Sequence, residues 1–165
     1  MAAEAATVAI AAVTPFARVR DRLRRTLGPD ALWLALAVAV VATAGSLWFS
    51  EGAHFRPCTL CWYQRICMYP LVPVLGVGAW RREQSPRIIA LVLAGTGLGI
   101  SLYHILVEHF PGLESGVCDP SNPCNLIWVR RFGYLTIPTM AASAFAFVIA
   151  LVLLADPSPR SQEDS

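Results

Sequence analysis

Four long apolar segments constrain this chain more than any other feature of its sequence. They cover residues 31–49, 58–80, 88–110 and 135–155. Each is close to the ~20 residues that a helix needs to cross ~30 Å of hydrocarbon. The chain is 56% hydrophobic with a mean hydropathy of +0.54, which excludes an ordinary soluble domain. The sequence therefore predicts an all-α membrane protein, built as a bundle of four transmembrane helices.

Arginine placement predicts the orientation of these helices. With the N-terminus in the cytoplasm, nine arginines lie on the cytoplasmic side and four on the other. Because cytoplasmic flanks carry the excess of arginine, we expect both termini in the cytoplasm. The chain then divides into a basic cytoplasmic tail (1–29), a transmembrane domain (30–155) with an extracytoplasmic loop (111–134), and a disordered tail (156–165). The tail arginines favour a positive flank over a surface-lying amphipathic helix, and a cleaved signal peptide is not expected.

Prolines and small residues shape the predicted helices. Pro70 and Pro73 should kink the second helix, and Pro138 falls near the start of the fourth, where its missing N–H costs little. Small residues are expected to let the third and fourth helices approach closely; they are Gly95, Gly97, Gly99 and residues 141–144.

A C-x-x-C motif begins the second apolar segment. On a helix, Cys58 and Cys61 share one face, and Arg65 can place its guanidinium beside the Cys61 sulfur. A fixed cation and the amides of a helix N-terminus both favour the thiolate, which is the reactive form of cysteine. An arginine inside a spanning helix is usually functional, although snorkelling to the interface would also explain it. The motif indicates a redox dithiol at a membrane surface.

A second pair, Cys118 and Cys124, lies in the predicted extracytoplasmic loop. The prolines, Asp119 and Asn122 between them favour turns, which bias the segment to fold back on itself. A disulfide is the simplest interpretation, and it would close a loop too short for strong entropic stabilisation. An exposed disulfide of this kind is open to attack by a partner thiolate, which favours exchange over a structural role.

Other interpretations of these residues stay open. Two cysteine pairs on one side of a membrane can bind zinc, but Arg65 and the C-x5-C spacing of the second pair disfavour it, so no metal is expected. A protein with purely structural disulfides fits the same pattern. Cys67 leaves the face of the C-x-x-C motif and is expected to be a small buried residue. His104 is either an ordinary helix-end histidine or a hydrogen-bonding partner of a ligand.

Together these features resemble the DsbB family of bacterial disulfide-bond-formation proteins, in particular its shorter BdbC-like branch. The resemblance covers residues 31–155. It rests on the four apolar segments and on three motifs: Pro57-Cys58-x-x-Cys61-Trp62-Tyr63-Gln64-Arg65 with the following Met68-Tyr69-Pro70, the Cys118/Cys124 pair, and Phe132-Gly133-Tyr134-x-Thr136-Ile137-Pro138.

The resemblance implies a quinone-dependent thiol-disulfide oxidoreductase of the bacterial cytoplasmic membrane. Such a protein reoxidises a DsbA-like thioredoxin-fold thiol oxidase and passes the electrons to a membrane quinone, either ubiquinone or menaquinone. Its partners are then this oxidase, the quinone and membrane lipid, and no nucleic acid. Carried over by position, Cys118 and Cys124 meet the partner, Cys58 and Cys61 lie next to the quinone, and Arg65 and His104 bind the quinone with Cys61.

One departure from the long-loop members of that family leaves a question open. Cys118 and Cys124 are only six positions apart in a shorter loop, so the sequence does not say how the two pairs reach one another or which loop cysteine is attacked first. Two alternatives remain: a non-catalytic membrane protein with structural disulfides, and a quinone reductase like vitamin K epoxide reductase. The C-x-x-C at the start of the second helix favours the DsbB-like interpretation over the latter.

Overall fold

Helices make up almost all of the structure. The computed structural model describes residues 19–81, 84–114, 116–119, 121–127 and 135–155. Residues 19–27 are helical. They are followed by α2 (Ala31–Leu47), the π-helix η1 (Trp48–Gly52), α3 (Thr59–Met68), α4 (Leu71–Arg81), α5 (Gln84–His109), the short 3-10 helix η2 (Pro111–Leu113) and α6 (Ile137–Leu154). The predicted all-α class is confirmed for these residues.

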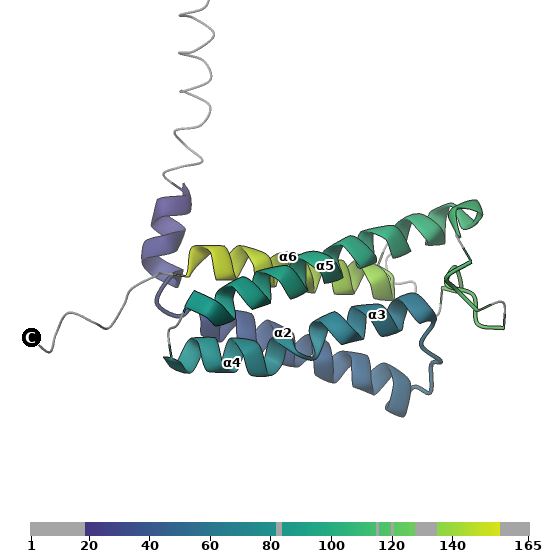
Figure 1. The fold of residues 1–165 in the computed structure, drawn as a ribbon, viewed down its shortest axis with the longest axis horizontal. Helices are drawn as coiled ribbons and strands as arrows, with labels where there is room; N and C mark the ends of the chain where they lie inside the picture. The colour runs from purple at the N-terminus through teal and green to yellow at the C-terminus, as the bar shows by residue number, and fades with distance from the viewer. Residues whose placement is uncertain (1–18, 82–83, 115, 120, 128–134, 156–165) are drawn as a thin grey trace, which may run out of the picture.

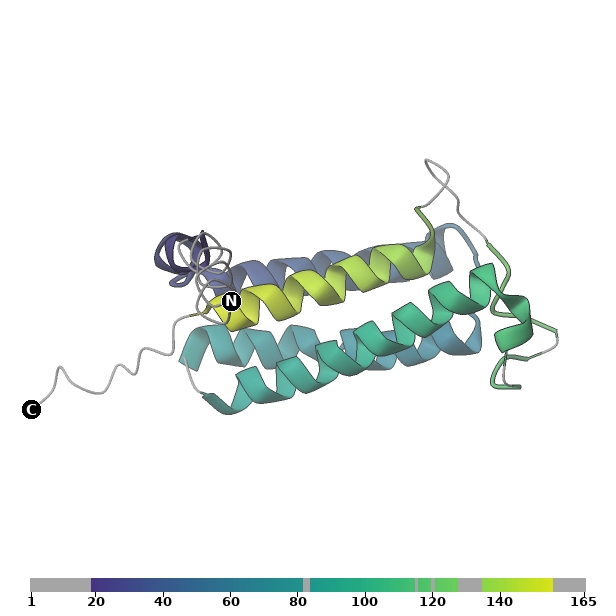
Figure 2. The ribbon, with the colours of Figure 1, turned by 90° about the horizontal axis from the view of Figure 1, so that it is seen from above.

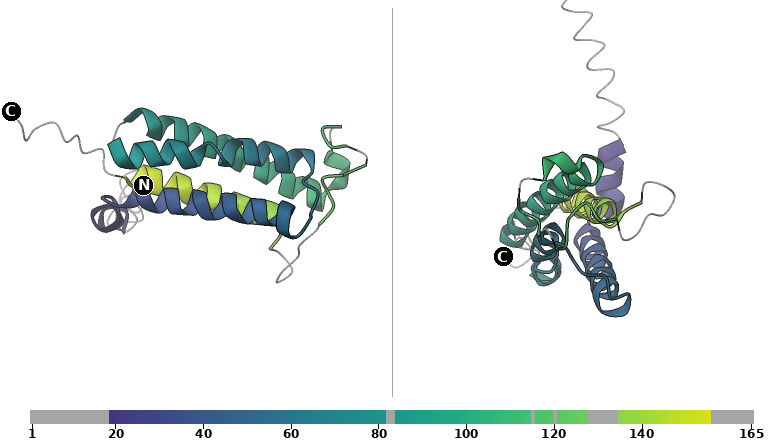
Figure 3. Two further views of the ribbon diagram at one scale, coloured as in Figure 1. Left: turned by 90° about the horizontal axis from the view of Figure 1, so that it is seen from below. Right: turned by 90° about the vertical axis from the view of Figure 1, so that its right-hand side faces the viewer.

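The long helices form a closed bundle. α5 packs on α6, α3 and α4, while α2 packs on α6 and α4. Two views across the bundle show α3 and α4 following one another in the same direction (Figures 1 and 2). The end of the bundle that carries η2 and the Cys118–Cys124 segment is called the loop end below. At the loop end, α2 and η1 diverge from α3 (Figures 1 and 3).

Within the described residues, three stretches of helix are long and apolar enough to cross a membrane. They are Ala31–Gly52, Ser85–His109 and Ile137–Leu154. Large apolar side chains such as Val41, Trp80 and Phe147 point outward, as expected for helices surrounded by lipid. The chain is a helical membrane protein. The remaining predicted crossing, residues 58–80, is divided between α3 and α4, so the number of crossings and the cytoplasmic position of the termini stay predictions.

The division of that segment follows from a proline. Tyr69 and Pro70 form a turn between α3 and α4, because proline lacks an N–H and its ring clashes with the preceding helical turn. The predicted break at Pro70 is confirmed. Pro73 lies in the first turn of α4, where it does not interrupt the helix. The prediction that it also kinks the segment is wrong for this reason.

Small residues bring the helices together at specific points. Ala31, Ala35 and Ala39 of α2 are fully buried. At the contact of α5 with α6, a Cβ added to Gly97 would overlap the ring of Phe145. The predicted close approach is confirmed at Gly97. It is wrong for Gly95 and Gly99, which face open space. Cys67 is buried in this core, as predicted.

The start of α6 is tied to α5 at the loop end. The N–H of Thr136 donates to Thr139 Oγ1 at 2.7 Å, and Pro138 occupies the first turn of α6, as predicted. The hydroxyl of Thr136 donates to the Glu108 carboxylate at 2.8 Å. This contact places Glu108, one turn after His104, against the first turn of α6. The tails at 1–18 and 156–165 and the Phe132–Tyr134 part of the last motif lie outside the described residues.

Candidate active site

The C-x-x-C motif lies at the N-terminus of α3. Cys58 is the residue before the helix, with extended backbone angles (φ −73°, ψ 174°), and its sulfur accepts a hydrogen bond from the Cys61 N–H at 3.3 Å. The expectation that both cysteines lie within a helix is therefore wrong for Cys58. Both are free thiols, with sulfur atoms 2.7 Å apart. The helix amides around them favour negative charge on these sulfurs.

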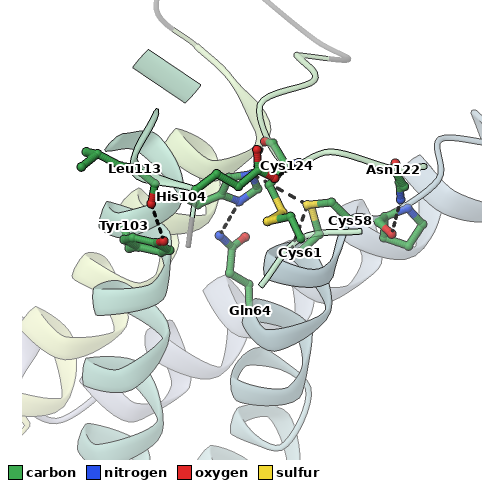
Figure 4. Close-up of a disulfide and its surroundings, with 11 residues drawn as sticks. Cys58, Cys61, Gln64, Tyr103, His104, Leu113, Asn122 and Cys124 are labelled. Atoms are coloured by element: carbon green, nitrogen blue, oxygen red, sulfur yellow. Dashed lines mark hydrogen bonds between the residues drawn. A yellow bond between two sulfur atoms is a disulfide. The ribbon is translucent and has the colours of Figure 1, made fainter. Parts of the chain in front are cut away.

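His104 of α5 faces this motif from the other side (Figure 4). Its Nε2 is 3.8 Å from the Cys58 sulfur and 3.0 Å from the carbonyl oxygen of Cys124. Its Nδ1 is 3.1 Å from the amide nitrogen of Gln64. His104 and Gln64 are both buried. One imidazole therefore touches both cysteine pairs and a buried amide.

The second pair forms a disulfide, as predicted. Cys118 and Cys124 are joined, with their Cα atoms 5.8 Å apart. The turn between them is held by Asp119, whose carboxylate accepts hydrogen bonds from the Ser121 N–H at 2.8 Å and hydroxyl at 2.7 Å. These donors hold the pKa of the Asp119 carboxyl below its usual value.

The disulfide is buried, which corrects the expectation of an exposed one. Cys118 and Cys124 are 8% and 1% exposed. They pack with Cys58, Leu60 and Val107 in one apolar cluster at the loop end. The reason is that the loop folds back onto the bundle instead of extending away from it.

A side chain of the loop fixes this position. The amide of Asn122 donates to the Pro57 carbonyl oxygen at 3.1 Å, next to Cys58 (Figure 4). The short loop thus lies directly over the C-x-x-C motif. The two cysteine pairs reach one another despite the short loop, because they lie in the same cluster.

A large apolar cavity opens beside the C-x-x-C motif. Its volume is about 580 Å³. Its lining residues come from α2 and η1 on one side, from α3 on another, and from α6. Cys61 and Arg65 both line it, among apolar side chains that include Phe49, Phe55 and Met140. The structure therefore brings together two of the three residues predicted to bind a quinone.

The third, His104, lines a different space. A small cavity of about 20 Å³ lies between Cys58, Cys61, His104 and Glu108. Cys61 borders both spaces. The role of His104 at a quinone stays a prediction, and its observed neighbours are the two cysteine pairs.

Arg65 is held at the wall of the large cavity by the end of the first long helix. Its guanidinium donates to the Ser46 carbonyl oxygen at 2.9 Å and to the Ser50 hydroxyl at 2.6 Å. Its Cζ lies 5.3 Å from the centre of the Trp62 ring, a cation–π contact. Ser50 belongs to the π-helix η1, an element that is frequent at functional sites.

Sequence reasoning did not assign Ser46, Ser50 or Gln64 to the site. The sequence did point to Gln64, because a polar amide in a long apolar segment needs a buried hydrogen-bonding partner. Ser46 and Ser50 carried none, since serines are common in membrane helices and a π-helix has no simple sequence pattern.

Two groups among the described residues bring potential metal ligands together. The ligand atoms of Cys58, Cys61 and His104 lie within 4.8 Å of one another. These three residues could be ligands of a tetrahedral zinc or a redox dithiol beside an imidazole, and the expectation that no metal is bound stays a prediction. Glu114, Cys118 and Cys124 form a second group, but its cysteines are joined in a disulfide.

Comparison with known proteins gives a consistent result. The family described as "Disulfide bond formation protein DsbB" matches residues 29–155. A "Probable disulfide formation protein" of Oceanobacillus iheyensis is 46% identical over 74% of this chain and 86% of that protein. "Disulfide bond formation protein C" of Bacillus subtilis is 41% identical over 74% of this chain and 90% of that protein. A "Probable disulfide formation protein" of Chlamydia pneumoniae is 36% identical over 75% of this chain and 90% of that protein. No solved structure matches this chain.

Proposed function

Because this chain belongs to the DsbB family of disulfide bond formation proteins, we propose that it is a quinone-linked oxidase of a thioredoxin-fold partner. The partner is a DsbA-like extracytoplasmic thiol oxidase that inserts disulfides into exported proteins. Membership of the family implies thiol oxidoreductase activity. The observation that carries the finer proposal is the placement of two cysteine pairs in one buried cluster beside a large apolar cavity.

The first reaction exchanges a disulfide with the partner. A partner thiolate attacks the Cys118–Cys124 disulfide, and its second thiol then releases the partner in its disulfide form. The loop is left as a dithiol, having gained two electrons and two protons. This dithiol reduces a Cys58–Cys61 disulfide in a second exchange, with the same two electrons and two protons. The contact of both pairs in one cluster supports this step.

The quinone is the final electron acceptor in the proposal. It takes two electrons and two protons from the Cys58/Cys61 dithiol, which returns to the disulfide. The cavity fits such a substrate because its lining is apolar, its volume is about 580 Å³, and Cys61 borders it. Arg65 is the cation placed to stabilise negative charge on the sulfur or on a quinone oxygen. Ubiquinone and menaquinone both satisfy this chemistry.

The position of the arginines supports the proposed sidedness. Residues 19–27, the end of α4 and the start of α5 carry arginines, and they lie at the end of the bundle opposite the loop end (Figure 1). With these in the cytoplasm of a bacterial cell, both cysteine pairs face the oxidising side. The split segment α3–α4 is then the second of four crossings, interrupted at Pro70.

The test is a quinone-reduction assay on the purified protein in detergent. A reduced thioredoxin-fold dithiol protein is added, and loss of quinone absorbance is followed. We expect turnover in the natural protein, no turnover in Cys61→Ser or Cys118→Ser, and normal turnover in Cys67→Ala, whose thiol lies in the core away from both pairs. Full activity of Cys61→Ser would contradict the proposal.

One observation favours a second candidate, a non-catalytic membrane protein with structural disulfides. The Cys118–Cys124 disulfide is buried, as structural disulfides often are. This candidate predicts that the disulfide stays intact when reduced partner is supplied. Alkylation of new thiols, read by mass spectrometry, separates the two candidates.

A further inference from the structure

Gln64 is a buried amide that no step above uses. It lies on α3, is 5% exposed, and faces His104 of α5 (Figure 4). A buried amide is unfavourable unless its hydrogen bonds are satisfied. The amide nitrogen of Gln64 meets His104 Nδ1 at 3.1 Å. The Gln64–His104 contact therefore connects α3, which carries the C-x-x-C motif, to α5.

The contacts of His104 define which ring nitrogen carries the proton. A carbonyl oxygen only accepts hydrogen bonds, so the 3.0 Å contact with the Cys124 carbonyl requires a proton on Nε2. In a neutral imidazole Nδ1 is then the acceptor, and the Gln64 amide donates to it. The Cys124 carbonyl selects this tautomer, and the Gln64 amide satisfies it by turning its N–H group toward Nδ1.

This tautomer places one N–H between the two cysteine pairs. The Nε2–H holds the Cys124 backbone, and the Cys58 sulfur lies 3.8 Å away from the same nitrogen. The opposite tautomer would turn a lone pair toward the Cys124 carbonyl, which repels it. It would also leave the Cys58 sulfur without this donor.

We propose that Gln64 is a positioning residue for exchange between the two pairs, which it serves by hydrogen-bonding Nδ1 and so holding the His104 ring with its Nε2–H on Cys124. His104 then keeps Cys124 against Cys58 and donates to the Cys58 sulfur whenever that sulfur is a thiolate. The exchange needs no further reactant, because the loop dithiol is oxidised as Cys58–Cys61 is reduced. The inference rests on the proposed function for its kinetic part only.

The tautomer is tested directly by nitrogen NMR on the full chain in detergent with ¹⁵N-labelled histidine. The signals of His104 are assigned by their loss in His104→Asn. We expect the natural protein to show a protonated Nε2 and a bare Nδ1. Gln64→Met keeps the length of the side chain but not the amide, so Nδ1 loses its hydrogen-bond donor and its nitrogen signal should shift and broaden as the ring becomes less fixed. An unchanged His104 spectrum in Gln64→Met would overturn the inference.

A second variant keeps the test independent of folding defects. Gln64→Glu offers a carboxylate to Nδ1, so both ring nitrogens should carry protons and the Nε2–H should persist. The other titratable groups that face this ring are Cys58, Cys61 and Glu108, and they are the same in both variants. A His104 spectrum in Gln64→Glu that matches Gln64→Met would count against the inference.

The kinetic readout is the rate of transfer between the pairs, measured by rapid mixing with reduced partner and thiol trapping. Gln64→Met should slow this transfer about tenfold, the size expected for one lost hydrogen bond, and Gln64→Glu should largely restore it. Gln64 also lines the large cavity, so a change confined to the quinone KM would overturn the positioning role.

The matched control is Ser101→Ala. Ser101 is also fully buried on α5, but its hydroxyl donates to Gly97 of the same helix at 2.8 Å. Its spectrum and transfer rate should equal those of the natural protein. If the natural protein fails to reduce any quinone, the proposed function falls, while the tautomer experiment still decides the role of Gln64.

Discussion

The two cysteine pairs share one cluster but are held in different ways. Cys58 and Cys61 are fixed by the N-terminus of α3, and Cys61 reaches the large apolar cavity. Cys118 and Cys124 are fixed by a turn and by side-chain hydrogen bonds, from Asn122 to the Pro57 carbonyl and from His104 to the Cys124 carbonyl. The first pair is thus built into the bundle, whereas the second lies on a loop that covers it.

This difference suggests a division of labour. The buried disulfide must become accessible before a partner protein can attack it, and a few side-chain hydrogen bonds restrain its loop less than a helix restrains the first pair. The dithiol on α3 needs no such movement, because its electron acceptor is proposed to come from the lipid side through the cavity. A rigid pair suits a small membrane substrate, and a releasable pair suits a protein.

The largest expected effects come from removing one cysteine of either pair, because each pair is proposed to react with a different substrate. Cys58→Ser should abolish quinone reduction with any reductant, because no disulfide can form at the cavity. Cys118→Ser should abolish it with the reduced partner but keep it with dithiothreitol, a small dithiol that reaches the first pair. Quinone absorbance measured with both reductants checks this. Equal loss with both reductants in Cys118→Ser would show that the pairs are not divided in this way.

Arg65→Ala should affect the first pair alone. It removes a cation that lines the cavity with Cys61, so the KM for quinone should rise about ten- to hundredfold, the range for hydrogen bonds to charged groups. The reaction of the Cys118–Cys124 disulfide with the partner should keep its rate. Steady-state kinetics with varied quinone measure the first effect, and thiol trapping measures the second. An unchanged quinone KM and rate would argue against any role for Arg65.

Asn122→Ala should affect the second pair alone. Loss of the bond to Pro57 frees the loop, so the partner should react faster and transfer between the pairs should slow, each by about fivefold. Rapid mixing with reduced partner resolves the two steps. Ser121→Ala is the control, since the Ser121 hydroxyl bonds only to Asp119 within the same turn. Identical kinetics of the two variants would contradict the role given to the Asn122 bond.

The smallest effect is expected from Ser50→Ala. Arg65 loses its hydrogen bond to this hydroxyl but keeps the one to the Ser46 carbonyl, so the quinone KM should rise only about two- to fivefold. The same quinone titration measures it. Ser143→Ala is the control, because that hydroxyl is exposed and bonds within α6. An effect as large as that of Arg65→Ala would mean that the π-helix η1 contributes more than this one contact.

Local features of the structure were predicted well from the sequence. The apolar segments, the break at Pro70, the place of Pro138 in the first turn of α6 and the Cys118–Cys124 disulfide each follow from residues that are neighbours in the chain. The family was also correctly identified from its motifs. These features depend on helix periodicity, on the missing N–H of proline and on turn-forming residues, all of which a single sequence displays.

The contacts that complete the site were not predicted. Arg65 bonds Ser46 and Ser50, Gln64 bonds His104, and the loop is buried over Cys58. Each joins segments far apart in the chain, so it depends on how the helices pack and not on local pattern. The exposed disulfide was expected for the same reason, because a loop rich in turn residues carries no sign of the surface onto which it folds.

The central claim is that the two pairs act in series, and a single-turnover experiment tests it most directly. Fully oxidised protein, freed of quinone, is mixed with reduced partner, and the cysteines are alkylated at intervals and identified by mass spectrometry. The account predicts that Cys118 and Cys124 become thiols first, that Cys58 and Cys61 follow, and that added quinone reoxidises all four. Reduction that stops at Cys118 and Cys124, with Cys58–Cys61 left intact, would contradict it.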